Sequence, residues 1–220
     1  MNDLEYLNQI ETEIGFNLIK AEKKQNLREN HYFVENGYIV SLDISKIKLK
    51  KLPSTIQNLT HLQELGFCVE EFPDWIEVLK NLQKLFFSGI EIYPHEIKKF
   101  GNLKSLSFSL ENSKEPKIPP WIHNLTELND LFINFPQNTK ISINIEFEKL
   151  NKLKMIWFEG AFILPENFGN LMNLNTLIIK NSKFELPQTI GNLKSLGSLQ
   201  INNTNLEYCA NKSLSASNEE

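Results

Sequence analysis

Residues 53–67 read PSTIQNLTHLQELGF, and the spacing of the apolar residues in this stretch decides the fold. From Pro53 to Leu62 every third residue is proline or apolar, a step typical of 3₁₀ and short helical turns that stack side chains on one face. Leu65 and Phe67 are two residues apart, which is the period of a β-strand. The stretch therefore predicts a turn segment that starts at a proline, where a missing N–H costs nothing, and then a short strand.

The same pattern recurs along most of the chain at intervals of twenty to twenty-five residues. The copies that start with proline begin at Pro53, Pro73, Pro94, Pro119, Pro165 and Pro187. A degenerate copy has Asn144 in place of the proline. Self-similarity at such a period is the signature of a solenoid, in which each unit buries its apolar edge against the next unit.

A strand pattern occurs in every unit, and together the units predict eight parallel strands. Each strand has an apolar residue near its start and two more that are separated by one outward-facing residue. These apolar positions are Ile39, Leu42 and Ile44; Leu62, Leu65 and Phe67; Leu82, Leu85 and Phe87; Leu103, Leu106 and Phe108; Leu128, Leu131 and Ile133; Leu153, Ile156 and Phe158; Leu174, Leu177 and Ile179; and Leu196, Leu199 and Ile201. Because the side chains of a strand alternate between two faces, we expect these residues to form one continuous core.

Residues 39–206 resemble the leucine-rich repeat family, whose units read LxxLxLxx followed by LPxxIxxLxxL. They are most similar to the short-repeat type of bacterial, archaeal and Ras-suppressor-like proteins. The resemblance implies an α/β solenoid shaped like a horseshoe, with eight or so parallel strands on the concave face and 3₁₀ or short helical turns on the convex face. Ile47 departs from the family, which usually has an asparagine after the strand, so we expect irregular loops there.

Composition restricts the function further. The chain has 220 residues, 41% of them hydrophobic, and a net charge of −4, which suits one elongated core without a second domain. The charges are mixed and form no basic stripe, which argues against a nucleic-acid partner. No apolar run reaches the length of a membrane span, and the N-terminus lacks the basic and apolar regions of a secretory signal.

The two cysteines, Cys68 and Cys209, follow the second and the eighth predicted strands. Six strand spacings put them roughly 30 Å apart, which is too far for a disulfide. Unpaired cysteines are typical of a reducing compartment. Together with the missing secretory signal, they predict a cytoplasmic protein.

The N-terminal end carries signals for a cap on the first repeat. Asn2 and Glu5 have the spacing of a helix capping box, and Gly15 marks a helix end. Residues 32–35 form a strand pattern, and the Asn36-Gly37 pair predicts a tight hairpin into the first repeat strand. The alternative is that the helix binds a partner instead of closing the core.

These signals divide the chain into three parts: a cap (1–37), a solenoid (38–208) and a disordered polar tail (209–220). No proline-started turn follows the eighth strand, so its outer edge is open unless Tyr208 and Leu214 cover it. An open edge permits self-association through the C-terminal end.

One residue in each predicted strand points away from the core and lines the concave face. In chain order these residues are Asp43, Gly66, Phe86, Ser107, Phe132, Trp157, Ile178 and Gln200. Phe132, Trp157 and Ile178 lie on three adjacent strands, and an exposed apolar group of this size predicts a partner-binding surface. Phe86, and Phe135 just past the fifth strand, extend it. The alternative is that these side chains only pack against cross-strand neighbours.

The two longest connections also point to this region. They follow Phe108 and Ile133 and cover residues 109–118 and 134–143. Insertions in repeat proteins often gather on the functional face, so we expect these two to form the rim of the binding surface. Neutral variation of loop length is the alternative.

The search for catalytic motifs finds none. The four histidines, His31, His61, His95 and His123, fall in different repeats without metal-ligand spacing. There is no phosphate-binding glycine loop and no G-x-S-x-G motif. The sequence therefore predicts a non-enzymatic protein-binding module without metal or cofactor. The family resemblance leaves two alternatives: a regulator of a small GTPase or signalling protein, and the recognition part of a larger enzyme.

Overall fold

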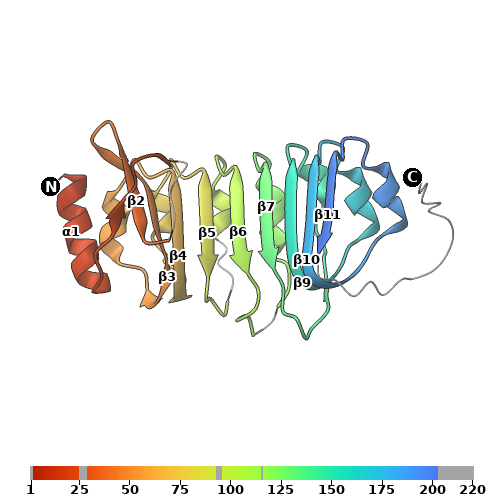
Figure 1. Cartoon of the computed structure of the whole chain (residues 1–220), viewed down its shortest axis with the longest axis horizontal. Helices are drawn as coiled ribbons and strands as arrows, with labels where there is room; N and C mark the ends of the chain where they lie inside the picture. The colour runs from red at the N-terminus through yellow and green to blue at the C-terminus, as the bar shows by residue number, and fades with distance from the viewer. Residues whose placement is uncertain (1, 25–28, 93–95, 115, 203–220) are drawn as a thin grey trace.

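The computed structural model describes residues 2–24, 29–92, 96–114 and 116–202. They form one elongated open sheet, with α1 (Asp3–Ile14) at one end (Figure 1). Along the sheet the strands follow chain order, except that the short β8 pairs only with β9. The strands are β1 (Ile19–Lys20), β2 (His31–Glu35), β3 (Tyr38–Lys51), β4 (Glu64–Glu71), β5 (Lys84–Ser88), β6 (Ser105–Ser109), β7 (Asp130–Asn134), β8 (Ile141–Ser142), β9 (Met155–Ile163), β10 (Thr176–Glu185) and β11 (Ser198–Asn202).

The eight predicted repeat strands are confirmed as β3 to β7 and β9 to β11, all parallel to one another. Their register is regular. Leu106 pairs with Leu85 on one side and Leu131 on the other, so equivalent leucines of successive repeats align across the sheet. A one-residue slip would turn every apolar side chain out of the core, which is why the pattern fixes the register.

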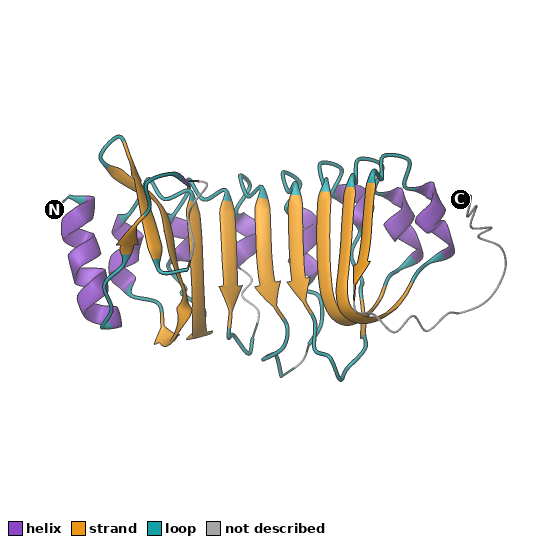
Figure 2. Ribbon diagram, viewed as in Figure 1, coloured by secondary structure: helices purple, strands orange, loops and turns teal. Residues whose placement is uncertain are grey.

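Short 3₁₀ helices lie behind the sheet, on the side opposite the viewer in Figure 2. The described ones are η2 (Ser54–Asn58), η3 (Ile76–Val78), η4 (Glu96–Lys99), η5 (Pro120–Asn124), η6 (Phe147–Lys149), η7 (Glu166–Asn170) and η8 (Gln188–Asn192). Pro53, Pro165 and Pro187 each immediately precede their helix as the N-cap residue. The predicted step of three is thus confirmed as 3₁₀ geometry.

The core between the sheet and the 3₁₀ helices is continuous along the molecule. Phe67, Phe87 and Phe108 from three successive repeats stack with ring centroids 6.1 and 5.7 Å apart. Side-chain amides join neighbouring repeats at the surface: Asn81 Nδ2 donates to the Thr60 carbonyl at 2.8 Å. Each repeat is therefore held mainly by its two neighbours.

The N-terminal residues extend this core. Asn2 and Glu5 form the predicted capping box, and Gly15 ends the helix in the left-handed conformation. Asn36 and Gly37 both have positive φ, which matches the hairpin turn between the antiparallel strands β2 and β3. The parallel strand β1 next to β2 is an addition that the sequence pattern did not indicate.

The expected irregularity after the strands is present, and at two pairs of repeats it takes the form of a register shift between paired strands. β3 and β4, and likewise β9 and β10, resume pairing after a register shift and run on towards the next turn segment. Gly160 permits this bend in β9, because its φ is +103° and an added Cβ would lie 2.1 Å from the Phe135 carbonyl oxygen.

β11 is the last described strand of the sheet, and its far edge has no partner among the described residues. Leu199 is 50% exposed, whereas Leu177 at the equivalent position of β10 is fully buried. The core thus opens at this end of the described chain. The expectations for the tail 209–220, Tyr208, Cys209 and Leu214 lie outside the described residues.

Candidate partner-binding face

We call the sheet surface that is turned away from the 3₁₀ helices the concave face. The strand register places one residue from each of five consecutive strands in a row across this face. These residues, at paired positions, are Phe86, Ser107, Phe132, Trp157 and Ile178. Their neighbours in sequence, such as Leu131 and Ile133, are buried on the opposite side. The predicted alternation along each strand is therefore present.

We call Phe86, Phe132, Trp157 and Ile178 the aromatic strip. Phe86 is 37% exposed, and the other three side chains are half-buried. The rings of Phe132 and Trp157 lie 6.2 Å apart at an interplanar angle of 49°. The ammonium of Lys180, on β10, lies 4.2 Å from the centre of the Trp157 ring, in a cation–π contact.

Phe135 does not belong to this surface, and the sequence-based assignment of this residue is wrong. Its side chain is fully buried and packs against Phe158 and Phe162, with ring centroids 5.4 and 5.0 Å away. The backbone explains the difference. The Phe135 N–H donates to the Glu159 carbonyl at 2.6 Å, so the chain continues along β9 and the side chain turns into the core.

The two long connections behave differently. Glu111 and Asn112 of the first connection line a hollow of about 430 Å³ together with Phe86, Phe132 and Trp157. In the second connection only the first residue, Asn134, lines it. The rest folds back along the solenoid, where β8 pairs with β9 and both Ile141 and Ile143 are buried.

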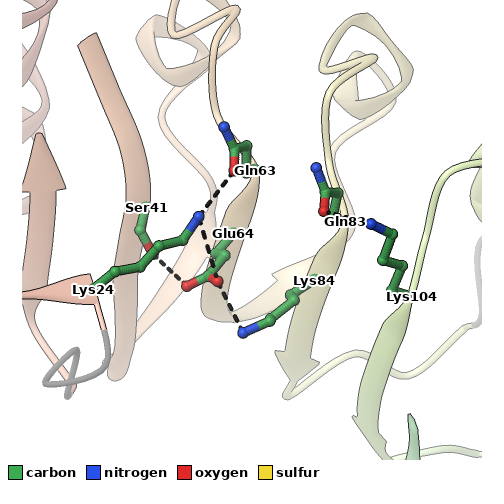
Figure 3. Close-up of polar contacts among 7 residues, drawn as sticks. All are labelled: Lys24, Ser41, Gln63, Glu64, Gln83, Lys84 and Lys104. Atoms are coloured by element: carbon green, nitrogen blue, oxygen red, sulfur yellow. Dashed lines mark hydrogen bonds and ion pairs between the residues drawn. The ribbon is translucent and has the colours of Figure 1, made fainter. Parts of the chain in front are cut away.

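The part of the concave face near the N-terminus is charged, and its charges pair with one another (Figure 3). The Glu64 carboxylate is 13% exposed, lies 2.9 Å from Lys84 Nζ and 3.8 Å from Lys24 Nζ, and accepts a hydrogen bond from Ser41 Oγ at 2.8 Å. Lys24 Nζ also donates to Gln63 Oε1 at 2.9 Å. The cluster ties the N-terminal segment and β3, β4 and β5 together.

Asp43 completes this charged end. Its Oδ1 accepts from the Ser45 backbone N–H at 2.9 Å and from the Ser45 hydroxyl at 2.6 Å. A Cβ added to the facing Gly66 would lie 2.8 Å from the Asp43 carboxyl carbon, so glycine makes room for the carboxylate. We call Asp43, Glu64 and Lys84, with Lys24 and Ser41, the charged end; the sequence reasoning found only Asp43. For Glu64 and Lys84 the sequence signal was their position just before Leu65 and Leu85.

Asp130 lies on β7 beside Phe132, in the same row as Glu64 and Lys84, paired in register with Ser105 on one side and Met155 on the other. Burial raises the pKa of the Asp130 carboxyl above its usual 3.8, while the positive charges of Lys84 and Lys154 partly oppose this change. The pKa direction shows that a charge in the middle of the concave face is partly removed from water.

The described residues contain no group of three or more His, Cys, Asp or Glu side chains arranged to hold a metal ion. Within the same residues, no helix has the length and apolarity that crossing a membrane requires. Cys68 is a free, half-buried thiol. It lines the edge of the 430 Å³ hollow, next to Phe86 and Gly89.

No model of a known protein family matches the chain. A curated relative, subunit LRRC8D of the volume-regulated anion channel from Rattus norvegicus, is 22% identical over 255 residues. The match covers 74% of this chain and 30% of that subunit. The chain therefore spans less than a third of the length of this relative.

Similar solved structures define the fold of the chain. Internalin C2 from Listeria monocytogenes has a TM-score of 0.57 at 17% identity, over 93% of this chain and 87% of its own. The Arabidopsis receptor kinase HAESA, solved with the peptide hormone IDA and the co-receptor SERK1, has a TM-score of 0.54 at 19% identity, over 78% and 36%. Other similar structures are described as leucine-rich repeat proteins. The chain is a leucine-rich repeat solenoid, as its sequence pattern predicts.

Proposed function

We propose that this protein is a non-enzymatic binding module that holds a protein partner on its concave face, with the aromatic strip as the main contact. The observation that carries this proposal is the strip itself. Three apolar side chains, Phe132, Trp157 and Ile178, stand next to one another on a surface where the other described strands present mostly small, polar or charged residues. Interfaces concentrate binding energy in such aromatic anchors.

The pairing of polar groups within the molecule also favours the aromatic strip as the binding surface. At the charged end, Glu64 already has two lysines and a serine as partners, so an incoming group would have to displace them. At the aromatic strip, exposed ring surface remains available and the hollow beside it provides depth. A partner gains free energy by covering apolar area there, at about 25 cal/mol per Å².

The test is capture of partner proteins by the immobilised protein and its variants. We expect Trp157→Ala to lose the partner that the wild type retains, and Lys98→Glu, on the opposite surface near η4, to keep it. If Lys98→Glu, on the convex face, loses the partner and Trp157→Ala keeps it, the concave face is not the binding surface.

Two further functions stay hypotheses that rest on the sequence resemblance alone: regulation of a small GTPase or signalling protein, and recognition for a larger enzyme. We also propose the cytoplasm as the location, since Cys68 is a free thiol. Cell fractionation tests the location. A partner that proves to be a GTPase would favour the first alternative.

We propose the division into cap (1–37), solenoid (38–208) and tail (209–220), and self-association through the β11 edge. The exposure of Leu199 and the unpaired described edge of β11 support self-association. Sedimentation at rising concentration tests it: we expect a dimer that Leu199→Lys abolishes. A strict monomer at all concentrations would exclude it.

A further inference from the structure

A narrow slot separates two aromatic rings of the strip. Phe86 of β5 and Phe132 of β7 flank Ser107 of β6, which has one of the smallest side chains in the row. Two strand spacings put the Cα atoms of the two phenylalanines about 9.6 Å apart. Phe132 packs towards Trp157, and Phe86 has no ring partner among the described residues. The space above Ser107 therefore stays open.

The slot joins two hollows. The 430 Å³ hollow described above and a second one of about 310 Å³, which extends over the charged end, are both lined by Phe86, Ser107 and Phe132. A side chain that enters between the rings can thus reach polar groups on either side. The floor is the Ser107 hydroxyl, and the walls are apolar.

The larger hollow is acidic. Glu111 and Glu159 line it, together with the amides of Asn112 and Asn134, and no lysine, arginine or histidine does. Glu111 forms no ion pair within the described part of the chain, Glu159 Oε1 accepts one hydrogen bond from Asn181 Nδ2 at 2.8 Å, and Asn134 Oδ1 is buried without a hydrogen-bond donor. Lys180 lies over the Trp157 ring and is not part of the lining. The hollow therefore carries negative charge with no positive charge in its lining.

We propose that the slot formed by Phe86, Ser107 and Phe132 binds an arginine side chain of the protein partner. This rests on the proposed function and names the chemistry of the partner. A guanidinium above Ser107 is one strand spacing, about 4.8 Å, from the strand of each phenylalanine, so both rings are within reach of a cation–π contact, whose limit is about 6 Å. Its planar fork stacks on both rings while its N–H groups donate to Glu111 and Glu159.

Other side chains use the slot less well. A lysine ammonium has no plane to stack between the rings and no fork for two carboxylates. An aromatic ring fills the slot but gives Glu111 no donor and Glu159 none beyond Asn181 Nδ2. The contact between Lys180 and Trp157 shows that this strip already holds a cation of the chain itself.

The slot also sets the spacing of the partner's anchors. The distance from β6 to the space between β9 and β10 is two and a half strand spacings, about 12 Å. An extended partner segment that crosses the strands covers this distance in about four residues. Residues four apart point to the same side of an extended chain. The arginine is therefore followed or preceded, four positions away, by a large apolar residue that covers Trp157 and Ile178.

The experiment is a nuclear magnetic resonance titration of the whole chain with Nα-acetyl-arginine amide, and separately with Nα-acetyl-lysine amide. We expect the arginine probe to shift the backbone amide signals of Phe86, Ser107 and Phe132 with millimolar affinity. Ser107→Leu fills the slot and abolishes the shifts. Ser198→Leu, the same change on β11 of the same face, keeps them. Equal shifts with the lysine probe, or none with arginine, overturn the proposal.

Two more measurements separate this inference from the proposed function. Glu111→Gln with Glu159→Gln should weaken the arginine probe about tenfold, the value of one charge-assisted hydrogen bond. A peptide with arginine and leucine four positions apart should bind more tightly than one with them two apart; equal binding overturns the spacing. If Ser107→Leu keeps a partner that Trp157→Ala loses, the arginine slot is wrong and the binding face stands.

Discussion

The two ends of the concave face use the same backbone for opposite purposes. At the charged end, Glu64 is surrounded by Lys24, Lys84 and Ser41, so its carboxylate is satisfied within the molecule. At the aromatic strip, the row two residues further along the strands carries Phe132 and Trp157, which touch each other but remain half-exposed. Both regions lie on the same regular ladder of parallel strands.

The difference shows how a repeat scaffold assigns roles to positions. The outward residues contribute little to the core, so their identity is free to vary from repeat to repeat. Where they pair with one another, as at the charged end, they stabilise the end of the solenoid. Where they leave apolar surface and acceptors open, they leave binding free energy for another molecule. The comparison predicts that variants at one end change stability and variants at the other change binding.

The largest effect is expected beneath the aromatic strip. Phe135→Ala should lower the free energy of unfolding by about 3–5 kcal/mol, because it removes a fully buried ring and leaves a cavity between Phe158 and Phe162. Urea unfolding followed by circular dichroism measures this. Partner capture per folded molecule should stay normal. Loss of binding by a stable Phe135→Ala protein would show that Phe135 belongs to the binding surface.

Trp157→Ala should have the next largest effect, and it should appear in binding. We expect a loss of about 2 kcal/mol, roughly thirtyfold in affinity, because the ring is a central anchor of the strip. Stability should change by less than about 1 kcal/mol, since the ring makes only cross-strand and cation–π contacts. Calorimetric titration with the captured partner and thermal unfolding give the two values. Lower stability with unchanged affinity would show that the side chains of the strip only pack against neighbouring strands.

Glu64→Gln should show the reverse behaviour at the charged end. We expect it to destabilise the fold by about 1 kcal/mol, because the half-buried cluster loses its central charge. Partner affinity should not change. The matched control is Glu70→Gln, since Glu70 pairs with Lys48 at 3.3 Å but both side chains are mostly exposed. A control as destabilised as Glu64→Gln would show that burial of the cluster contributes nothing.

The smallest effect concerns Asp130, beside Phe132 on β7. Burial raises the pKa of its carboxyl, so the folded state holds the proton more tightly than the unfolded state. The ionised form therefore destabilises the fold above the folded pKa, and this cost disappears as the pH falls through the folded pKa towards 3.8. Asp130→Asn should stabilise the protein at pH 7 by about 0.5 kcal/mol.

The pH dependence of this gain is the decisive measurement. The stability difference between Asp130→Asn and the wild type should shrink as the pH is lowered, and taking the difference cancels the contributions of the other carboxylates. Urea unfolding at several pH values measures it. A gain that grows at low pH would mean that Asp130 is stabilised as an anion, by Lys84 or Lys154, instead of being penalised by burial.

Periodicity was sufficient for the parts of the molecule that repeat. The steps of three and two between Pro53 and Phe67 predict the 3₁₀ helices and the strands, because each spacing places apolar side chains on one face. The capping box at Asn2 and the turn at Gly37 are local signals of the same kind. The outward row from Phe86 to Ile178 follows from strand alternation alone, so the sequence by itself determined the architecture and this row of the concave face.

Only the tertiary structure decided which of these residues contact one another and which are free. Phe135 turned into the core because its backbone pairs with β9, and no local pattern encodes that bond. The Glu64 cluster joins residues that are distant in sequence, and the slot above Ser107 exists because the register sets two rings on either side of a small side chain. Pairing between repeats depends on long-range register and on loop lengths that differ between units. Spacing within one repeat carries no information about either.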